Sequence, residues 1–281
     1  MKVVKHRLIA DDGAAVPYLA SPNLGGPIVP HLLIIHYTAG SSVAGTVDWF
    51  RNPASRVSAH LVIGRDGAIT QMVPFNRGAW HAGVSQWGSL HGLNRYSIGI
   101  ELDNAGQLIR SGGQWISPLT RRSYADSEVT LARHKNDPPG TPPSGWHAYT
   151  QAQIEATQAC GLALMRHYAL DDVLGHDDIA PGRKRDPGPD FPMASLRARL
   201  VGRADEPADR WRTTTELNVR SGAGTEFPAV PGSPLPRGTE VEVLARQGLW
   251  WQVDVVGSVG GVNDCVGWCH SKYLQPVRPQ G

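Results

Sequence analysis

The chain has 281 residues, of which 41% are hydrophobic and 19% charged, and its 27 basic and 25 acidic side chains leave a formal charge of +2. This length predicts two domains, because single hydrophobic cores stop growing beyond about 250–300 residues. No apolar run approaches the roughly 20 residues of a membrane-spanning helix, and no element concentrates Lys and Arg as a phosphate-binding surface does. We therefore expect no membrane span and no nucleic-acid partner, and we favour a monomer.

Three cysteines are too few and too scattered to form a disulfide framework. Cys265 and Cys269 stand close to His270, but a structural zinc site would need a fourth ligand and a tighter cysteine spacing. We expect both cysteines to be buried and to act as small hydrophobic residues of the core.

The first strong element is a buried strand that ends in a histidine. Residues 32–35 of HLLIIHYTAG are apolar without alternation, which is typical of a strand buried on both faces, and His36 follows them. The next run, HLVIGRDGAITQMVP, predicts two strands joined at Asp66-Gly67, a strong hairpin signal. A further short strand, YSIGIEL, places Glu101 near its end.

Residues 103–149 are polar and rich in proline, so we expect a long loop over one face of the sheet. Thr150 and Gln153 then form a capping box that begins a helix. Strands mixed with helices predict an α/β domain over residues 1–200, with a mixed central β-sheet flanked by helices. The apolar stripe of the helix is expected at Ile154, Gly161, Leu164, Met165 and Tyr168.

The pattern changes after a charged linker at 201–210. Residues 211–281 consist of short apolar runs separated by Gly and Pro turns, as in ELNVRSGAGTEFPAV and CVGWCHSKYL, and they show no helical periodicity. The sequence therefore predicts a small all-β barrel as a second domain.

The stretch GHDDIAPGRKRDPGP, residues 175–189, places His176 and Asp186 ten residues apart. Its prolines and glycines exclude a helix, so a loop can bring both side chains to one point. Two imidazoles, one carboxylate and an open fourth position are typical of a catalytic zinc site. His36, at the end of a buried strand, is the candidate for the missing imidazole. The alternative is that each histidine is a hydrogen-bonded structural residue, which is the commoner role of a single histidine at a strand end.

Four segments within residues 30–195 resemble one family when they are taken in order: IIHYTAG, VSAHLVIGRDGAITQMVPFNRGAWHAGVSQW, LNRYSIGIELDN and GHDDIAPGRKRDPGPDFP. They are similar to the zinc-dependent N-acetylmuramoyl-L-alanine amidases of the phage-amidase and peptidoglycan-recognition superfamily, nearest to its AmpD and AmiD branch. The resemblance implies one catalytic Zn²⁺ ion. It also implies hydrolysis of the amide bond between N-acetylmuramic acid and L-alanine, in peptidoglycan or in muropeptides.

The resemblance carries the metal ligands of the family onto His36, His176 and Asp186. It carries the catalytic glutamate onto Glu101, which would act as a general base, and the catalytic lysine onto Lys184, which would stabilise the oxyanion. A non-catalytic peptidoglycan recognition protein is the rival interpretation. Asp186 argues against it, because the binding-only members usually lack the third metal ligand.

Three further residues are candidates for substrate binding: Trp80 and His81 in AWHAG, and Asn104 in IELDN. The alternatives are that Trp80 braces the sheet and that Asn104 caps its loop. Asp177 and Asp178 are candidates for supporting the metal histidine, or for a solvated turn.

The second domain resembles the bacterial Src-homology-3-type domains over 213–275. Binding of the cell wall and a purely structural role are both open for it. Trp250, Trp251 and Tyr273 are candidates for exposed aromatic side chains, whereas Trp268 is expected in the core.

The first residues, MKVVKHRLIADDGAAV, show no apolar region of an export signal and no lipid-anchor cysteine. We expect synthesis in the cytoplasm, followed by action on muropeptides there or on the cell wall after release.

Overall fold

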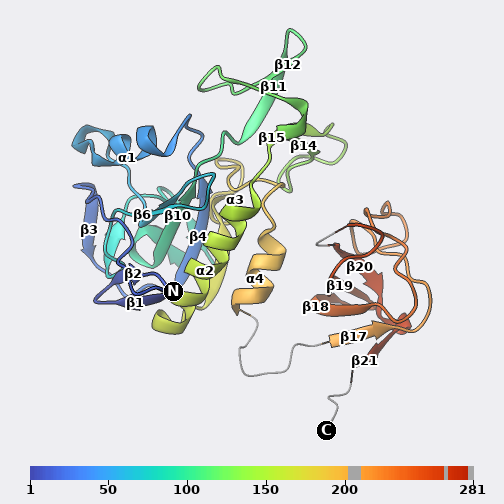
Figure 1. Cartoon of the computed structure of the whole chain (residues 1–281). Coiled ribbons are helices and arrows are strands. Elements are labelled where there is room, and N and C mark those ends of the chain that lie inside the picture. The colour runs from blue at the N-terminus through green and yellow to red at the C-terminus, as the bar shows by residue number, and fades with distance from the viewer. Residues whose placement is uncertain (202–209, 263–264, 278–281) are drawn as a thin grey trace. The chain divides into compact units, whose positions relative to one another are not determined.

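The computed structural model describes residues 1–201, 210–262 and 265–277. Its contacts divide the chain into two compact units, Met1–Met193 and Ala194–Gly281 (Figure 1). The expected domain end at residue 200 falls inside helix α4 (Met193–Val201), and most of the expected linker, 202–209, lies outside the described residues. Within the described part of the chain, no helix has the length and apolar character needed to cross a membrane.

Five strands form the central sheet of the first unit, in the order β16-β4-β10-β5-β6. The first four run parallel, and β6 returns antiparallel to β5 through the turn at Asp66-Gly67, as the hairpin signal predicted. The expected mixed central sheet is therefore confirmed. The strand bounds are Asp172–Gly175 (β16), Leu32–Tyr37 (β4), Ser97–Leu102 (β10), Leu61–Ile63 (β5) and Ile69–Gln71 (β6).

Helices flank this sheet, as expected. Helix α1 contacts β5, and helix α2 contacts both β5 and the N-terminal strand β1. The side chain of Ser42 caps α1 by accepting a hydrogen bond from the Gly45 N–H. The helices are α1 (Val43–Arg51), α2 (Gln151–Tyr168) and the single turn α3 (His176–Ile179), with 3₁₀ turns at Pro53–Ser55, Leu93–Arg95 and Asp126–Glu128.

The capping box of α2 is confirmed, because the side chains of Thr150 and Gln153 each accept a hydrogen bond from the other residue's backbone N–H. The expected apolar stripe is only partly right. Gly161 and Leu164 are buried, but Ile154, Met165 and Tyr168 are half-buried. Gln153 explains the shift: its amide donates to the Asp103 carbonyl and accepts from Arg65, so a polar side chain fills an inward position. The buried stripe consists of Gln153, Thr157, Cys160, Gly161, Ala163 and Leu164.

One face of β10 collects polar and small residues, and His36 of β4 lies on the same face. The register places Glu101 beside His36, and alternate residues of a strand point to the same face. Ser97, Gly99 and Glu101 therefore share the face of His36. The residues that alternate with them on β10 are apolar and buried: Ile98, Ile100 and Leu102.

Three two-stranded sheets also belong to the first unit. The pair β3–β7 leads directly into the AWHAG segment, and β8–β9 follows it. The bounds are Lys2–Val4 (β1), Arg7–Ile9 (β2), Leu24–Pro27 (β3), Arg77–Ala79 (β7), Gln86–Trp87 (β8) and Leu90–His91 (β9).

The expectation of a long loop at 103–149 is wrong, because this segment forms a five-stranded antiparallel sheet of its own, in the order β13-β12-β11-β15-β14. The strands are too short to show a hydrophobic period, and Gly112-Gly113 break the pattern between two of them. The Trp115 ring covers Gly145, where a Cβ would lie 2.5 Å from it. The strands are β11 (Gln107–Ser111), β12 (Gln114–Ile116), β13 (Ser123–Tyr124), β14 (Val129–Ala132) and β15 (Ser144–His147).

The second unit contains the expected all-β domain, with an antiparallel sheet in the order β20-β19-β18-β17-β21 around an apolar core. Cys265 and Cys269 are buried in that core, as predicted. Trp268 is half-buried rather than a core residue, because strand alternation turns it away from the face of Cys269. The strands are β17 (Arg210–Thr213), β18 (Glu240–Gln247), β19 (Trp250–Val255), β20 (Val266–His270) and β21 (Leu274–Pro276), with a 3₁₀ turn at Ser271–Tyr273.

Candidate metal centre

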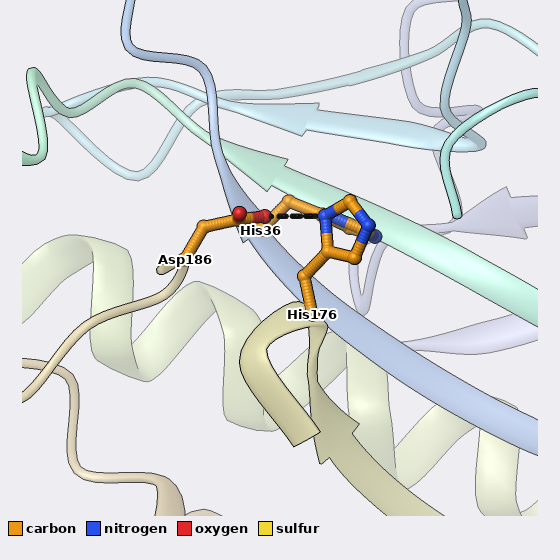
Figure 2. Close-up of side chains that lie close together, drawn as sticks. All are labelled: His36, His176 and Asp186. Atoms are coloured by element: carbon orange, nitrogen blue, oxygen red, sulfur yellow. Dashed lines mark hydrogen bonds and ion pairs between the residues drawn. The ribbon is translucent and has the colours of Figure 1, made fainter. Parts of the chain in front are cut away.

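Three buried side chains meet at one point beside the face of the central sheet that carries Glu101: His36, His176 and Asp186 (Figure 2). Nδ1 of His36 lies 2.9 Å from Nδ1 of His176 and 2.9 Å from Oδ2 of Asp186. Nδ1 of His176 lies 2.8 Å from the same carboxylate oxygen. The three ligand atoms therefore form a nearly equilateral triangle. Sequence reasoning grouped these residues, and the structure brings them together.

The topology explains why residues so far apart in sequence converge. His36 lies near the end of β4, and His176 begins α3 directly after β16, the parallel neighbour of β4. Neighbouring parallel strands end at the same edge of a sheet, so both imidazoles arrive together. The loop after α3 then returns Asp186, whose carbonyl accepts a hydrogen bond of 2.8 Å from the Asp177 N–H.

The three ligand atoms are arranged to bind a cation rather than to hydrogen-bond with one another. Nε2 of His176 lies 3.1 Å from the Ala82 carbonyl oxygen, which can only accept, so Nε2 carries the hydrogen of the neutral ring and Nδ1 is bare. Nη2 of Arg183 also lies 3.5 Å from Nε2, but its two hydrogens are taken by the nearer carbonyl oxygens of Ala82 and Val84, at 2.9 and 2.6 Å. Lone pairs of His176 and Asp186 therefore face each other at 2.8 Å. Two imidazoles and one carboxylate are the donor set of a catalytic zinc site.

Burial favours the neutral form of His36. Burial, and after it the charge of His176, lowers the pKa of His36 to about 4. A neutral imidazole is the form that binds a metal ion. His36 is therefore in the protonation state that metal binding requires near pH 7.

Glu101 lies one strand away from His36, on the same face. Its Oε2 atom is buried and has no hydrogen-bond partner among the residues that the structure describes. Burial, followed by the charge of Asp186, raises the pKa of Glu101 to about 8, against the opposing effect of Lys184. Lys184 also lowers the pKa of His36, so its ammonium group is within electrostatic reach of both residues. Their catalytic roles remain predictions.

The three residues expected to bind substrate lie in different surroundings. Trp80 is half-buried beside Gly25 of β3, and its contact with substrate stays a prediction. Asn104 is buried and uses its amide within the loop, donating to the His147 carbonyl and accepting from the Gly106 N–H. That position matches the loop-capping alternative.

His81 lies behind His36 rather than on an open surface. It is 9% exposed, and its two ring nitrogens contact Nε2 of His36 at 2.9 Å and Oγ of Ser97 at 3.3 Å. Burial, and then the charge of His36, lowers the pKa of His81 well below its usual value. Sequence reasoning missed Ser97 and Gly99, although the alternation S-x-G-x-E in YSIGIEL was a signal that they share one face with Glu101.

The acidic pair that follows His176 does not contact the metal histidines. Asp177 is buried and pairs with His134 at 3.0 Å and with Lys135 at 2.8 Å. Asp178 accepts a hydrogen bond from the Gly175 N–H and so caps α3. His134 and Lys135 follow β14 of the sheet within 103–149. Their contacts with Asp177 thus hold the segment that carries His176.

Comparison with known proteins finds two families along the chain. Residues 25–189, more than half of it, match the family model described as N-acetylmuramoyl-L-alanine amidase. Residues 215–275 match the model described as bacterial SH3 domain, which agrees with the all-β domain of the second unit.

Three known proteins illustrate this similarity. AmpD of Escherichia coli, named 1,6-anhydro-N-acetylmuramyl-L-alanine amidase, is 38% identical over 144 residues, which are 50% of this chain and 57% of AmpD. AmiD of E. coli, named N-acetylmuramoyl-L-alanine amidase, is 30% identical over 229 residues, which are 77% of this chain and 66% of AmiD. A crystal structure of AmpD covers 71% of this chain and 99% of its own at 30% identity, with a TM-score of 0.48. The chain thus spans less than two thirds of the length of these two curated relatives.

Proposed function

The chain belongs to the N-acetylmuramoyl-L-alanine amidase family, and on that basis we propose that it hydrolyses the amide bond between N-acetylmuramic acid and L-alanine in peptidoglycan or muropeptides. One observation carries the proposal. Three convergent ligand atoms with facing lone pairs lie near Glu101, whose buried Oε2 atom has no hydrogen-bond partner within the described part of the chain. This combination supports the proposal of a metal site with a general base beside it.

The ligands of the proposed single zinc ion are His36, His176 and Asp186. When bound, zinc supplies Lewis-acid chemistry, since it polarises an amide carbonyl and lowers the pKa of water. The protein orients the carboxylate and both imidazoles before any substrate arrives, because the three side chains are buried and come from the central sheet and the loop beside it.

Glu101 moves the proton in the proposed reaction. It takes a proton from the attacking water and delivers it to the nitrogen of the leaving L-alanine, which needs a proton to depart as an amine. Burial raises the pKa of Glu101 toward neutral pH, which favours this double task because the carboxyl group must both accept and release a proton. Lys184 supplies positive charge toward the oxygen that becomes negative during attack.

The second domain is proposed to hold the enzyme on the cell wall. Trp250 and Tyr273 both pack their rings near His270, with ring centroids 5.6 and 5.8 Å from it, and Tyr273 is 40% exposed. Trp251 fits this role less well, because its ring packs against Trp211 and under Arg246. Cosedimentation of a Trp250→Ala/Tyr273→Ala variant with intact sacculi tests this role, and binding as strong as that of the wild type would contradict it.

The decisive experiment combines metal analysis with product analysis. The purified chain, loaded with one equivalent of zinc, is incubated with intact sacculi and, separately, with a soluble anhydro-muropeptide. We expect free stem peptides with an L-alanine amino terminus in the mass spectrum, and their loss after chelation. Bound zinc without any released peptide would instead support the non-catalytic recognition protein. The preferred substrate of the two decides between action on the wall and action on muropeptides.

A further inference from the structure

We propose that two adjacent residues of the loop after β7, His81 and Ala82, support the metal centre from behind: the His81 ring sets the tautomer of His36, and the Ala82 carbonyl sets that of His176. The inference rests on the proposed function in so far as these two histidines are zinc ligands. It assigns His81 a positioning role in place of the substrate contact that the sequence suggested.

A chain of hydrogen bonds, in which each group donates to the next, runs from His36 through His81 and Ser97 to the Leu93 carbonyl. The Ser97 hydroxyl lies 2.7 Å from the Leu93 carbonyl oxygen, which can only accept, so the single Ser97 hydrogen points there. Ser97 Oγ must then accept from Nε2–H of His81, at 3.3 Å. In a neutral imidazole, the other nitrogen is a bare acceptor.

The bare Nδ1 of His81 lies 2.9 Å from Nε2 of His36. Two bare nitrogens would repel at this distance, so Nε2 of His36 carries a hydrogen and donates it to His81. The hydrogen of the His36 ring is thereby held on Nε2. Nδ1 of His36 keeps its lone pair and directs it to the point shared with His176 and Asp186.

The neighbouring residue does the same for the second imidazole through its backbone. The Ala82 carbonyl accepts from Nε2–H of His176 at 3.1 Å, which leaves Nδ1 of His176 bare. Arg183 donates to the same carbonyl at 2.9 Å and to the Val84 carbonyl at 2.6 Å, and so holds the loop against the segment that carries His176.

The loop itself is held at these two residues. Oδ1 of Asn94 accepts hydrogen bonds from the backbone N–H of His81, at 3.0 Å, and of Ala82, at 2.7 Å. The His81 ring lies directly over Gly99 of β10, where a Cβ would come within 2.5 Å of it. Glycine at 99 therefore leaves the space in which the ring reaches both Ser97 and His36.

The first test needs no substitution. Long-range ¹H–¹⁵N NMR spectra of the metal-free wild type report which nitrogen of each imidazole carries hydrogen. We expect hydrogen on Nε2 and a bare Nδ1 for His36, His81 and His176. Hydrogen on Nδ1 of His81 would overturn the proposal.

A pair of substitutions at one position then separates the role of the acceptor from packing. His81→Phe keeps a ring over Gly99 but has no acceptor, and we expect zinc to bind about 10- to 100-fold more weakly in chelator competition. His81→Asn places an amide oxygen near the former Nδ1 and should recover most of that loss. His91→Phe, at an exposed histidine of β9, is the matched control and should leave the zinc affinity unchanged.

These readouts are independent of hydrolysis. If His81→Phe binds zinc with wild-type affinity while His36 keeps its Nε2–H tautomer, the positioning role is refuted. If His81→Phe does not fold, the wild-type NMR spectrum still decides. If the tautomers and affinities follow expectation but no substrate is cleaved, only the proposed function fails.

Discussion

Two buried histidines on either side of one strand differ in a way that separates structure from function. In the sheet order β4-β10-β5, His36 lies on β4 and His60 directly precedes β5, with β10 between them. His60 is fully buried, and both of its ring nitrogens have backbone partners: Nδ1 accepts from the Gly99 N–H at 3.0 Å, and Nε2 donates to the Arg77 carbonyl at 2.9 Å. Nδ1 of His36 instead faces the ligand atoms of His176 and Asp186.

Burial is therefore the same in the two places, and the partners differ. Every hydrogen and lone pair of the His60 ring has a backbone counterpart, so this ring stabilises the sheet and is not available for other chemistry. The His36 ring is held at one nitrogen and bare at the other, which is the arrangement expected of a metal ligand. The hydrogen-bond partners of a buried histidine ring therefore predict its role better than the exposed fraction of its side chain does.

The largest effect is expected when the carboxylate of Asp186 is removed from the candidate metal site. In Asp186→Ala, two facing imidazoles remain without a negative group to hold a divalent cation, so we expect loss of bound zinc and activity reduced about 10⁴-fold or more. Zinc content by mass spectrometry under native conditions checks the first effect. Retention of one zinc per chain would show that the triangle is not the metal site.

Glu101→Gln separates catalysis from metal binding on the same face. The substitution keeps the size of the side chain and removes its ability to accept a proton, so we expect turnover to fall about 10²- to 10⁴-fold with zinc content unchanged. Turnover near that of the wild type would remove Glu101 from the reaction.

Lys184→Met tests a smaller contribution to the same reaction. The side chain keeps its length but loses the charge offered to the developing oxyanion, and we expect kcat to fall about 10²-fold, with bound zinc retained. A change confined to KM would assign Lys184 to substrate binding rather than to the transition state.

The smallest expected effect is on stability, and it concerns buried histidines with a structural role such as His60. Burial lowers the pKa values of His60 and His147 to about 4 from the usual 6.5, so the folded state holds both rings neutral while the unfolded chain takes up protons as the pH falls. The stabilisation is complete above pH 6.5 and is lost as the pH falls toward 4. When the pH is lowered from 7.5 to 5, the loss of this contribution should reduce the free energy of unfolding by about 2 kcal/mol for each histidine.

Urea unfolding at the two pH values measures this effect. His60→Asn keeps an acceptor near Nδ1 for the Gly99 N–H and cannot titrate, so its unfolding free energy should depend less steeply on pH than that of the wild type. An equal pH dependence would show that His60 does not provide this stabilisation.

Much of the fold follows from local sequence patterns. The apolar run at 32–35, the Asp66-Gly67 turn and the capping box at Thr150 all predicted elements that the structure contains, because each pattern acts within a few residues. The sheet at 107–147 could not be predicted this way. Its strands are two to five residues long and stabilise one another only by pairing across the insertion.

The candidate ligands were accessible from the sequence, since histidine and aspartate in a turn-rich segment indicate metal chemistry and a family resemblance indicated the third ligand. Their surroundings were not. His81 stands 45 residues from His36 and reaches it only because the loop after β7 crosses the face of β10 at Gly99.

The sequence by itself therefore indicated two domains, four of the five strands of the central sheet and the residues that could bind a metal ion; β16 was not predicted. Only the tertiary structure decided which nitrogen of each imidazole faces the point where the three ligand atoms meet. The physical reason is that a histidine tautomer depends on the partner of its other nitrogen. For His36 and His176, those partners are His81 and Ala82, adjacent in one loop and 45 and 94 residues away along the chain.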